Sequence, residues 1–470
     1  MSLAFYGLDA LLSLAPVELP RASEIQMGWR VFAFTTFVSL AVGFVFGVLP
    51  GLRASRADLV SSLKDGSASA GTARERVRSG LVIAEVALSL VLLAGAGLLL
   101  NSFWRLLQVD PGFNPEGALA VSFYLPSSRY PEIQQQEQFY GELEEKLRAI
   151  PGVRSVGATT SLPLNTNEST RSFLVEGRAA PAPGERTPMP YRAISPDYFR
   201  ATGIALLRGR AFDERDRAES TPVLVINETM ARRIWPDEDP LGRRLAFAED
   251  GPWHEVVGVV ADTKHYGLDE PARGAMYAPS LQRTWRWMSW RTFVLRTGQA
   301  RHSLLALLPR VRNELRLADE ELPIYAVDTL DAQVSGSMAS SRFSLIILGA
   351  FATAALALAS IGIYGVIAFA VGLRSREMGL RMALGASRAN VVSLIVRQAM
   401  KTVALGLAVG LVGAVLLTRF LSSSLYGVEP TDATTLFLAT IVLATVALGA
   451  VYWPARRATR VDPMLALRHE

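Results

Sequence analysis

The sequence predicts a multi-pass α-helical membrane protein of about five spanning helices with one large extracytoplasmic α+β domain. Three observations lead to this fold class. Apolar runs of membrane length gather near both ends of the 470-residue chain, a long block of mixed polarity separates them, and arginines cluster beside the apolar runs. The mean hydropathy of +0.25 and the 19% share of charged residues average over this segregation. Length alone allows two or three domains.

Five runs are long enough to cross a hydrocarbon core of about 30 Å at about 1.5 Å per residue. They cover residues 31–49, 81–100, 343–373, 402–421 and 433–453. The third run carries no charged residue and is longer than a bilayer needs, so we expect it to tilt or to project beyond the membrane. Helices that are apolar on every face are typical of membrane spans.

Flanking cations predict the orientation of the spans. Basic groups lie between the first and second spans, between the third and fourth, and after the fifth. Alternation of the spans places all three groups on one side, and the positive-inside rule makes that side the cytoplasm. The cation-free segment 422–432 then lies outside, together with the block at about 102–342, and the C-terminus lies in the cytoplasm.

Two stretches, residues 50–64 and 454–468, repeat each other without a gap. Each copy follows an apolar run, so the repeated unit is a membrane helix with a basic tail, as in proteins built from duplicated halves. The predicted orientation puts the first thirty residues outside, with no earlier span or signal to carry them there. We expect residues 1–70 to be the remnant of a preceding half. A five-span protein with an external N-terminus is the alternative.

The middle block shows the patterns of a soluble α+β domain. Alternation over 118–125, a helical period over 132–150 and alternation over 153–159 predict a βαβ unit. Further strands are predicted at 173–175, 222–227, 255–260, 292–295 and 324–327, and helices at 229–235 and 303–317.

The sequence offers little catalytic chemistry. Cysteine is absent, and the four histidines have no zinc-ligand spacing. Neither a G-x-S-x-G nor a Walker A pattern occurs, so we expect no catalytic residue, metal or cofactor, and any ATP hydrolysis would take place on another chain. The net charge of +5 is gathered beside the spans, which indicates membrane topology and no nucleic-acid partner.

Three features leave questions open. Glu85, the one acid within a span, is either a carboxylate near the inner interface that pairs with Arg76 or Arg78, or part of a proton relay. Gly406 and Gly410 indicate close helix packing without naming the partner helix. A tryptophan cluster is an interfacial anchor, a contact for an apolar ligand, or a loop folded over its own core. Its members are Trp285, Trp287 and Trp290.

Residues 374–388, between the third and fourth spans, form a short amphipathic segment. Cations flank an apolar ridge of Met378, Met382 and Leu384, and Gly385 can end a helical turn. Such a segment can lie along the membrane and offer its tip to a cytosolic partner. The alternative is a basic loop that only fixes the topology.

This segment resembles the signature of the FtsX-like permease family, the membrane subunits of MacB-type ABC transporters. The signature R-x-R-E-[IM]-G-[LI]-R-x-A-[LI]-G-A matches residues 374–386 at every position. The stretch 454–468 is similar to the closing motif of the family, and three further stretches, 196–212, 226–228 and 258–262, resemble the MacB-like periplasmic core. Together the resemblance covers about residues 75–470.

The family plan is one helix, a periplasmic domain and three further helices, which implies four segments. Residues 1–70 would be the remnant of a preceding permease half with the helix 31–49, because the repeat resembles duplicated permeases that carry two halves in one chain. Residues 71–104 would hold a juxtamembrane segment and the helix 81–100. Residues 105–340 would be the MacB-like core, and 341–470 the FtsX-like permease domain with three helices.

The resemblance also implies a function. The chain would be a permease subunit in a bacterial inner membrane that couples ATP hydrolysis by a separate cytosolic ABC ATPase to motion of the extracytoplasmic domain, for efflux or extrusion of an envelope substrate. A second permease, a periplasmic adaptor or an outer-membrane channel, and the lipid bilayer are the further implied partners. The alternative is a transmembrane regulatory protein that activates an envelope enzyme or sensor.

Two sets of residues carry this implied function. The ATPase-coupling segment consists of Arg376, Glu377, Met378, Gly379, Arg381, Met382, Ala383, Leu384, Gly385 and Ala386. The closing motif consists of Pro454, Arg457, Ala458, Asp462, Pro463, Leu467 and Arg468.

Overall fold

The computed structural model describes residues 29–43, 68–165, 169–180, 188–282, 290–298, 304–373, 378, 381–382 and 386–458. The chain forms two compact units. Unit 1 combines Met1–Leu107 with Ala339–Glu470, and unit 2 is Gln108–Met338.

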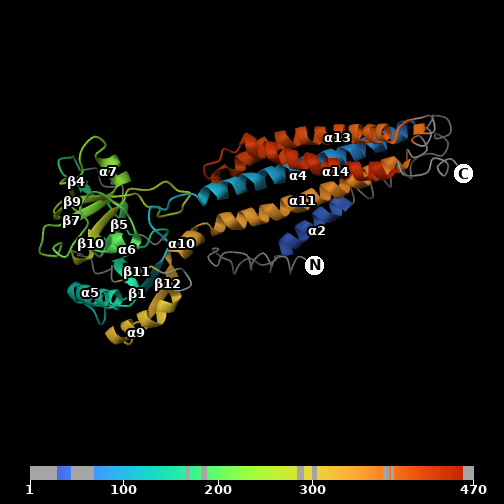
Figure 1. Cartoon of the computed structure of the whole chain (residues 1–470). Helices are drawn as coiled ribbons and strands as arrows, with labels where there is room; N and C mark the ends of the chain where they lie inside the picture. The colour runs from blue at the N-terminus through green and yellow to red at the C-terminus, as the bar shows by residue number, and fades with distance from the viewer. Residues whose placement is uncertain are drawn as a thin grey trace. The chain divides into compact units, whose positions relative to one another are not determined.

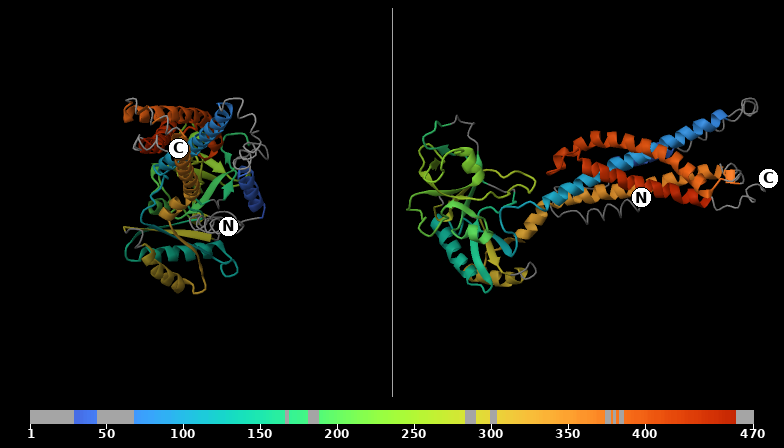
Figure 2. Two further views of the ribbon diagram at one scale, coloured as in Figure 1. Left: turned by 90° about the vertical axis from the view of Figure 1, so that its right-hand side faces the viewer. Right: turned by 45° about the horizontal axis from the view of Figure 1, so that its top comes forward.

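Unit 1 is built on four long helices that lie side by side (Figures 1 and 2). They are α4 (Ala68–Leu106), α11 (Ala339–Leu373), α13 (Arg388–Leu417) and α14 (Ala433–Ala458). Within the described residues, these are the four helices long and apolar enough to cross a membrane. A further apolar helix, α2 (Trp29–Gly43), has fifteen described residues. The multi-pass membrane fold is therefore confirmed.

The fourth predicted span lies within a longer helical stretch. The sequence predicts it at 402–421, whereas α13 begins at Arg388 and is followed by a 3₁₀ turn at Thr418–Ser424. The reason is local: the Ser387 hydroxyl accepts a hydrogen bond from the amide of Asn390 at 3.2 Å and so caps the helix. The cations that follow Ser387 therefore lie on the first turns of a helix rather than in a loop.

The glycine pair of α13 packs against α4. A Cβ on Gly406 would lie 2.9 Å from Val86 Cβ, and one on Gly410 would lie 3.0 Å from Ala87 Cα. The numbering offset between partners stays nearly constant along this contact, so the two helices run parallel. Glycines allow this close backbone approach, which answers the question of which helix the G-x-x-x-G pair serves.

α11 runs antiparallel to α4. The Arg78 guanidinium lies 4.0 Å over the ring of Phe369 at one end of this contact. Further along, the Glu85 carboxylate lies over Gly362, where any side chain would overlap it. Of the two cations suggested as partners of Glu85, Arg78 therefore stacks on an aromatic ring, and the side chain of Arg76 lies outside the described side chains.

Unit 2 contains a mixed sheet with helices on both faces (Figure 1). Its path has the order β12-β1-β11-β2-β5-β10-β7-β9-β8-β4, with β3 pairing β5 and β6 pairing β9. The strands are β1 (Ala118–Tyr124), β2 (Val153–Thr159), β3 (Thr170–Arg171), β4 (Leu174–Val175), β5 (Met189–Ile194), β6 (Leu206–Gly209), β7 (Val223–Asn227), β8 (Arg244–Ala246), β9 (Trp253–Val260), β10 (Met276–Pro279), β11 (Trp290–Thr297) and β12 (Ile324–Thr329). The helices are α5 (Ile133–Arg148), α6 (Tyr198–Thr202), α7 (Glu228–Ile234), α9 (Leu308–Ala318) and α10 (Leu330–Ser337).

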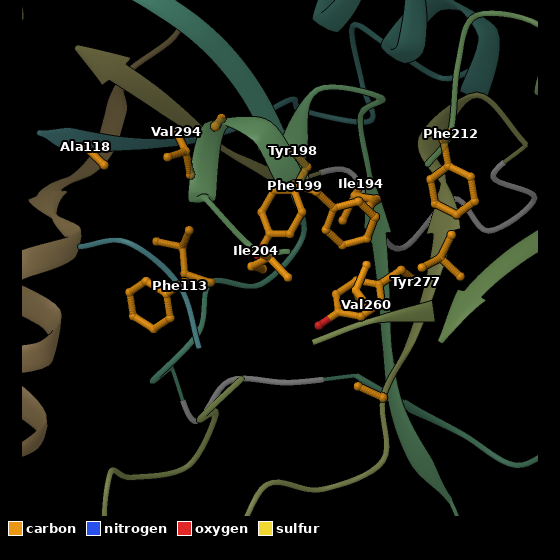
Figure 3. Packing of buried hydrophobic residues seen from close by; sticks show 14 of the residues in the cluster. Phe113, Ala118, Ile194, Tyr198, Phe199, Ile204, Phe212, Val260, Tyr277 and Val294 are labelled. Atoms are coloured by element: carbon orange, nitrogen blue, oxygen red, sulfur yellow. The ribbon is translucent and has the colours of Figure 1, made fainter. Parts of the chain in front are cut away.

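The sheet buries three apolar clusters. The first, the shared core, lines one face of the sheet from β1 to β9 and contains Phe113, Tyr198, Phe199, Tyr277 and Val294 (Figure 3). The second lies under α5 and α9 on the opposite face of the strands β12, β1, β11 and β2. The third lies under α7 on the opposite face of the remaining strands. One face therefore has a continuous core, and the other has two separate ones.

The predicted βαβ unit is present but split. β1 and β2 are each antiparallel to β11, which lies between them, so the two strands run parallel without pairing. Strands β3, β5, β6, β8 and β10 were not predicted. β5 contains a proline and the buried Arg192, which break the apolar alternation, and β10 is only four residues long.

Candidate functional site

The predicted coupling segment is described only in part. Met378, Arg381, Met382 and Ala386 lie within the described residues. Met378 and Met382 are half-buried, Arg381 is exposed, and the amide of Ala386 donates to the Arg381 carbonyl at 2.9 Å. This hydrogen bond closes a turn just before the cap of α13. The other members of the segment lie outside the described residues: Arg376, Glu377, Gly379, Ala383, Leu384 and Gly385.

The closing motif begins inside α14. Pro454 is buried within the helix, which continues to Ala458, and Arg457 is exposed. Asp462, Pro463, Leu467 and Arg468 lie outside the described residues. Of the closing motif, the structure therefore describes only Pro454, Arg457 and Ala458, which lie in the last turns of α14.

The described members of both sets lie at one end of unit 1. α4 and α13 run parallel, and α11 and α14 run the other way, so the start of α13 and the end of α14 lie at the same end of the helix bundle (Figure 1). Exposed arginines gather at this basic end. They include Arg381, Arg388, Arg456 and Arg457.

The opposite end of unit 1 is held by polar contacts. The amide of Tyr426 donates to the Ser102 hydroxyl at 2.8 Å, and Arg105 donates to the Gly427 carbonyl. Asp432 accepts from the amide of Thr435 at 2.9 Å and caps α14. The connection between α13 and α14 is therefore fastened to the last turns of α4.

Two carboxylates of unit 2, the half-buried Asp262 and the buried Asp216, are held in hydrogen-bond networks. Asp262 accepts hydrogen bonds from the amide of Thr229 at 2.8 Å, its hydroxyl at 2.6 Å, and the Asn227 side chain at 2.7 Å. This network fixes α7 to the ends of β7 and β9. Asp216 pairs with Arg210 through two contacts of 2.8 Å. Within the described part of the chain, no group of three His, Asp or Glu side chains could hold a metal ion.

Histidine and tryptophan side chains also serve the fold where they are described. His265 is buried and hydrogen-bonded to the Thr263 hydroxyl at 2.5 Å. The Trp290 indole of β11 donates to the Thr160 carbonyl, which ties it to the sheet. Trp285 and Trp287 lie outside the described residues.

A polar network that sequence reasoning missed lies where β2 meets β5. The Ser195 hydroxyl accepts from the amide of Ala158 at 2.8 Å and lies 3.3 Å from the Glu144 carboxyl, to which it donates. Arg148 reaches the same carboxyl at 3.1 Å and Asp197 at 2.8 Å. Burial raises the pKa of Glu144 to about 7, and the contacts with Ser195 and Arg148 act in the opposite direction without outweighing it.

Glu144→Gln should remove part of the pH dependence of stability. Because the folded state keeps a proton that the unfolded state releases above its ordinary pKa of 4.5, stability falls as pH rises from there to about 7. The contribution is at most about 3 kcal/mol. Thermal unfolding of the full chain in detergent at about pH 5 and pH 8 should show a larger loss of Tm for the wild type than for the variant.

His265 changes stability with pH in the opposite direction, but its contribution is the same in the wild type and in Glu144→Gln. Burial, reinforced by Arg192, holds the pKa of His265 well below 6.5, so this group lowers stability as pH falls. It is present in both proteins and drops out of their difference. Equal pH dependence in the wild type and in Glu144→Gln would contradict the assignment.

The fold and this site define a class of protein, a multi-pass membrane protein with a large extracytoplasmic α+β domain. The model of the MacB-like periplasmic core domain matches residues 79–317, and that of the FtsX-like permease C-terminal domain matches residues 349–463. The chain belongs to the MacB/FtsX-like permease family, whose members are components of ABC transporters, as its sequence signature predicts.

Curated relatives agree with this family. A "Macrolide export ATP-binding/permease protein MacB" of Mannheimia succiniciproducens is 23% identical over 318 residues, covering 65% of this chain and 46% of the relative. Another, of Azoarcus sp., is 27% identical over 290 residues, covering 59% and 42%. The chain thus spans about half the length of these relatives.

Solved structures include the periplasmic region of MacB from Actinobacillus actinomycetemcomitans, at 18% identity and a TM-score of 0.33, covering 48% of this chain and 95% of that one. The extracellular domain of the noncanonic ABC-type transporter YknZ from Gram-positive bacteria has 19% identity and a TM-score of 0.28, covering 43% and 93%.

Proposed function

We propose that this chain is the membrane subunit of an ABC-type transporter in which a separate cytosolic ATPase drives the extracytoplasmic domain. Membership of the MacB/FtsX-like permease family is the observation that carries the proposal. The sequence adds a second argument, because no Walker A pattern occurs in these 470 residues. The similar proteins are named as combined ATP-binding and permease proteins, and this chain spans about half of them.

The proposed docking site is the basic end of unit 1. Met378 and Met382 give it an apolar ridge, and the exposed arginines around that ridge suit an acidic rim on the partner. The turn closed between Arg381 and Ala386 leads directly into the capped start of α13. An ATPase that displaces Ala386 would therefore act on the capped start of a spanning helix.

Motion of the spanning helices would be transmitted to unit 2 through two chain connections. α4 continues into residue 108 of unit 2, and α10 of unit 2 leads back into α11. Both helices meet along the antiparallel contact that contains Glu85 and Gly362. A change in the pairing of α4 and α11 would thus reach both ends of the extracytoplasmic domain.

We also propose the membrane in which the protein lies, its further partners and the segments of its chain. We place the protein in a bacterial inner membrane with its C-terminus in the cytoplasm, paired with a second permease, with a periplasmic adaptor or outer-membrane channel as a further partner. Its task would be efflux or extrusion of an envelope substrate. We further propose that the chain divides into four segments, 1–70, 71–104, 105–340 and 341–470.

Co-purification tests the proposal. The full chain, extracted in mild detergent, should retain an ABC ATPase encoded near its gene, and the complex should depend on the ridge at Met382. A chain that binds none of these ATPases, or binds one independently of the ridge, would contradict the proposed docking site.

A further inference from the structure

The segment that enters unit 2 after α4 is fastened tightly. We call residues 111–117 the strap. The Pro111 carbonyl accepts from the amide of Lys264 at 2.9 Å, and the amide of Asn114 donates to the Thr202 carbonyl at 2.9 Å. Gly112 has a φ of +79° and lies so close to the Asp262 carbonyl that any side chain would overlap it. A force on the strap therefore reaches the interior of unit 2.

One arginine joins the strap to α6. The Arg296 guanidinium donates to the carbonyl of Asn114 at 2.7 Å, to that of Glu116, and to that of Ala201 at 2.7 Å. Asn114 and Glu116 belong to the strap, and Ala201 lies in α6. A planar guanidinium can serve three carbonyls at once, which a lysine ammonium on a flexible stem cannot do in the same geometry.

α6 in turn lies beside the shortest ladder of the sheet, the β2–β5 junction. Among the described residues, β2 and β5 form a single ladder pair, Thr159 with Ile194, and two further backbone hydrogen bonds flank it, from Thr160 to Ala193 at 3.1 Å and from Ser195 to Ala158 at 2.9 Å. Four strands lie on one side of this junction and the others on the far side. α6 packs on β2 beside it, where a Cβ on Gly157 would lie 2.5 Å from Tyr198 Cα.

The packing on the two faces of the sheet differs at this junction. The shared core continues across the junction and holds Phe113 of the strap (Figure 3). It also holds Leu330 of α10, so both chain connections end in it. On the other face the two apolar clusters are separate, and the polar network of Glu144 and Ser195 marks the junction. Two half-sheets joined in this way can turn relative to each other with little loss of apolar burial on that face.

We propose that the β2–β5 junction is a hinge within the extracytoplasmic domain and that α6, held by Arg296 to the strap, sets its angle. The purpose of the hinge rests on the proposed function, because the strap continues from a spanning helix. The inference also gives a role to the family motif at 196–212, which contains α6. The turn of the two half-sheets would be the motion that the domain passes on.

Distance measurements between spin labels test the hinge in the full chain, which has no native cysteine. One pair, at Leu317→Cys in α9 and Arg233→Cys in α7, reports across the junction. A second pair, at Leu317→Cys and Glu145→Cys in α5, reports within one half-sheet. All three positions are exposed.

Loosening the strap should change only the first pair. In Gly112→Ala, the distance distribution across the junction should shift or broaden, while the distribution within the half-sheet stays as in the wild type. Gly242→Ala is the matched control, because its φ is +77° but nothing lies within 4 Å of the added carbon. If Gly112→Ala does not fold, the same two distances are measured in Arg296→Lys. This variant releases the strap carbonyls from the guanidinium without a steric clash.

Two outcomes would overturn the hinge. Unchanged distributions across the junction in the folded strap variants would show that the strap does not set the angle. Equal broadening of both pairs would show general loosening instead of a hinge. The measurement needs no ATPase, so its failure would leave the proposed docking site to its own test.

Discussion

Met382→Glu should abolish the binding of a cytosolic ABC ATPase to this chain. Met382 is half-buried on the helical turn between α11 and α13. A docking ridge works by burying apolar atoms against the partner, and a carboxylate placed there would be desolvated at the contact and would face the acidic rim proposed for the partner. Desolvating a charge against apolar and acidic partner groups costs on the order of 3–5 kcal/mol, which lowers affinity by about a hundredfold or more.

Met382→Leu is the matched control, since it keeps an apolar side chain of similar volume and should keep the ATPase bound. Wild type and both variants would be expressed with the ATPase and isolated through a tag on the permease, and the ratio of the two chains would be measured. Stoichiometric ATPase on Met382→Glu would rule out the ridge as the docking surface.

Gly410→Leu should unfold or misassemble the helix bundle. A Cβ at this position already lies 3.0 Å from Ala87 Cα and from Leu90 Cβ, so the larger side chain must push α13 away from α4. Overpacking of this kind costs about 1–3 kcal/mol or more, and here it also removes the close contact that holds two spanning helices together.

Gly449→Leu controls for the substitution itself. Gly449 is in α14, another spanning helix, and nothing lies within 4 Å of its added carbon. The yield of folded protein in detergent and its Tm should fall for Gly410→Leu and stay near wild type for Gly449→Leu. Equal behaviour of the two variants would contradict the packing of α13 on α4.

The spans could be predicted because their signal is local. A run such as 343–373 shows its apolarity within one window, and α11 covers it. Gly406 and Gly410 indicated a close helix contact in the sequence. The partner helix, α4, is set by tertiary packing, and only the structure identifies it. Apolarity indicated only residues 402–421 of the stretch that α13 begins at Arg388, because apolarity does not mark a helix that extends beyond the apolar run.

The sheet of unit 2 was harder to predict because its pairing is non-local. Nothing near β1 or β2 indicates that β11, more than a hundred residues away, inserts between them. Glu144 was missed for the same reason, because its partner Ser195 is distant in sequence and an acidic helix normally faces water. The motif at 196–212 was noticed through resemblance, while its position at the junction required the fold.

The central claim is that the coupling segment and the extracytoplasmic domain lie on opposite sides of the membrane. Because the chain has no cysteine, Asp237→Cys in unit 2 and Asn390→Cys at the start of α13 can each be labelled singly with a membrane-impermeant maleimide on spheroplasts. Both residues are exposed. The account predicts that Asp237→Cys reacts at once and that Asn390→Cys reacts only after the membrane is opened. Immediate labelling of both positions, or protection of both, would contradict it.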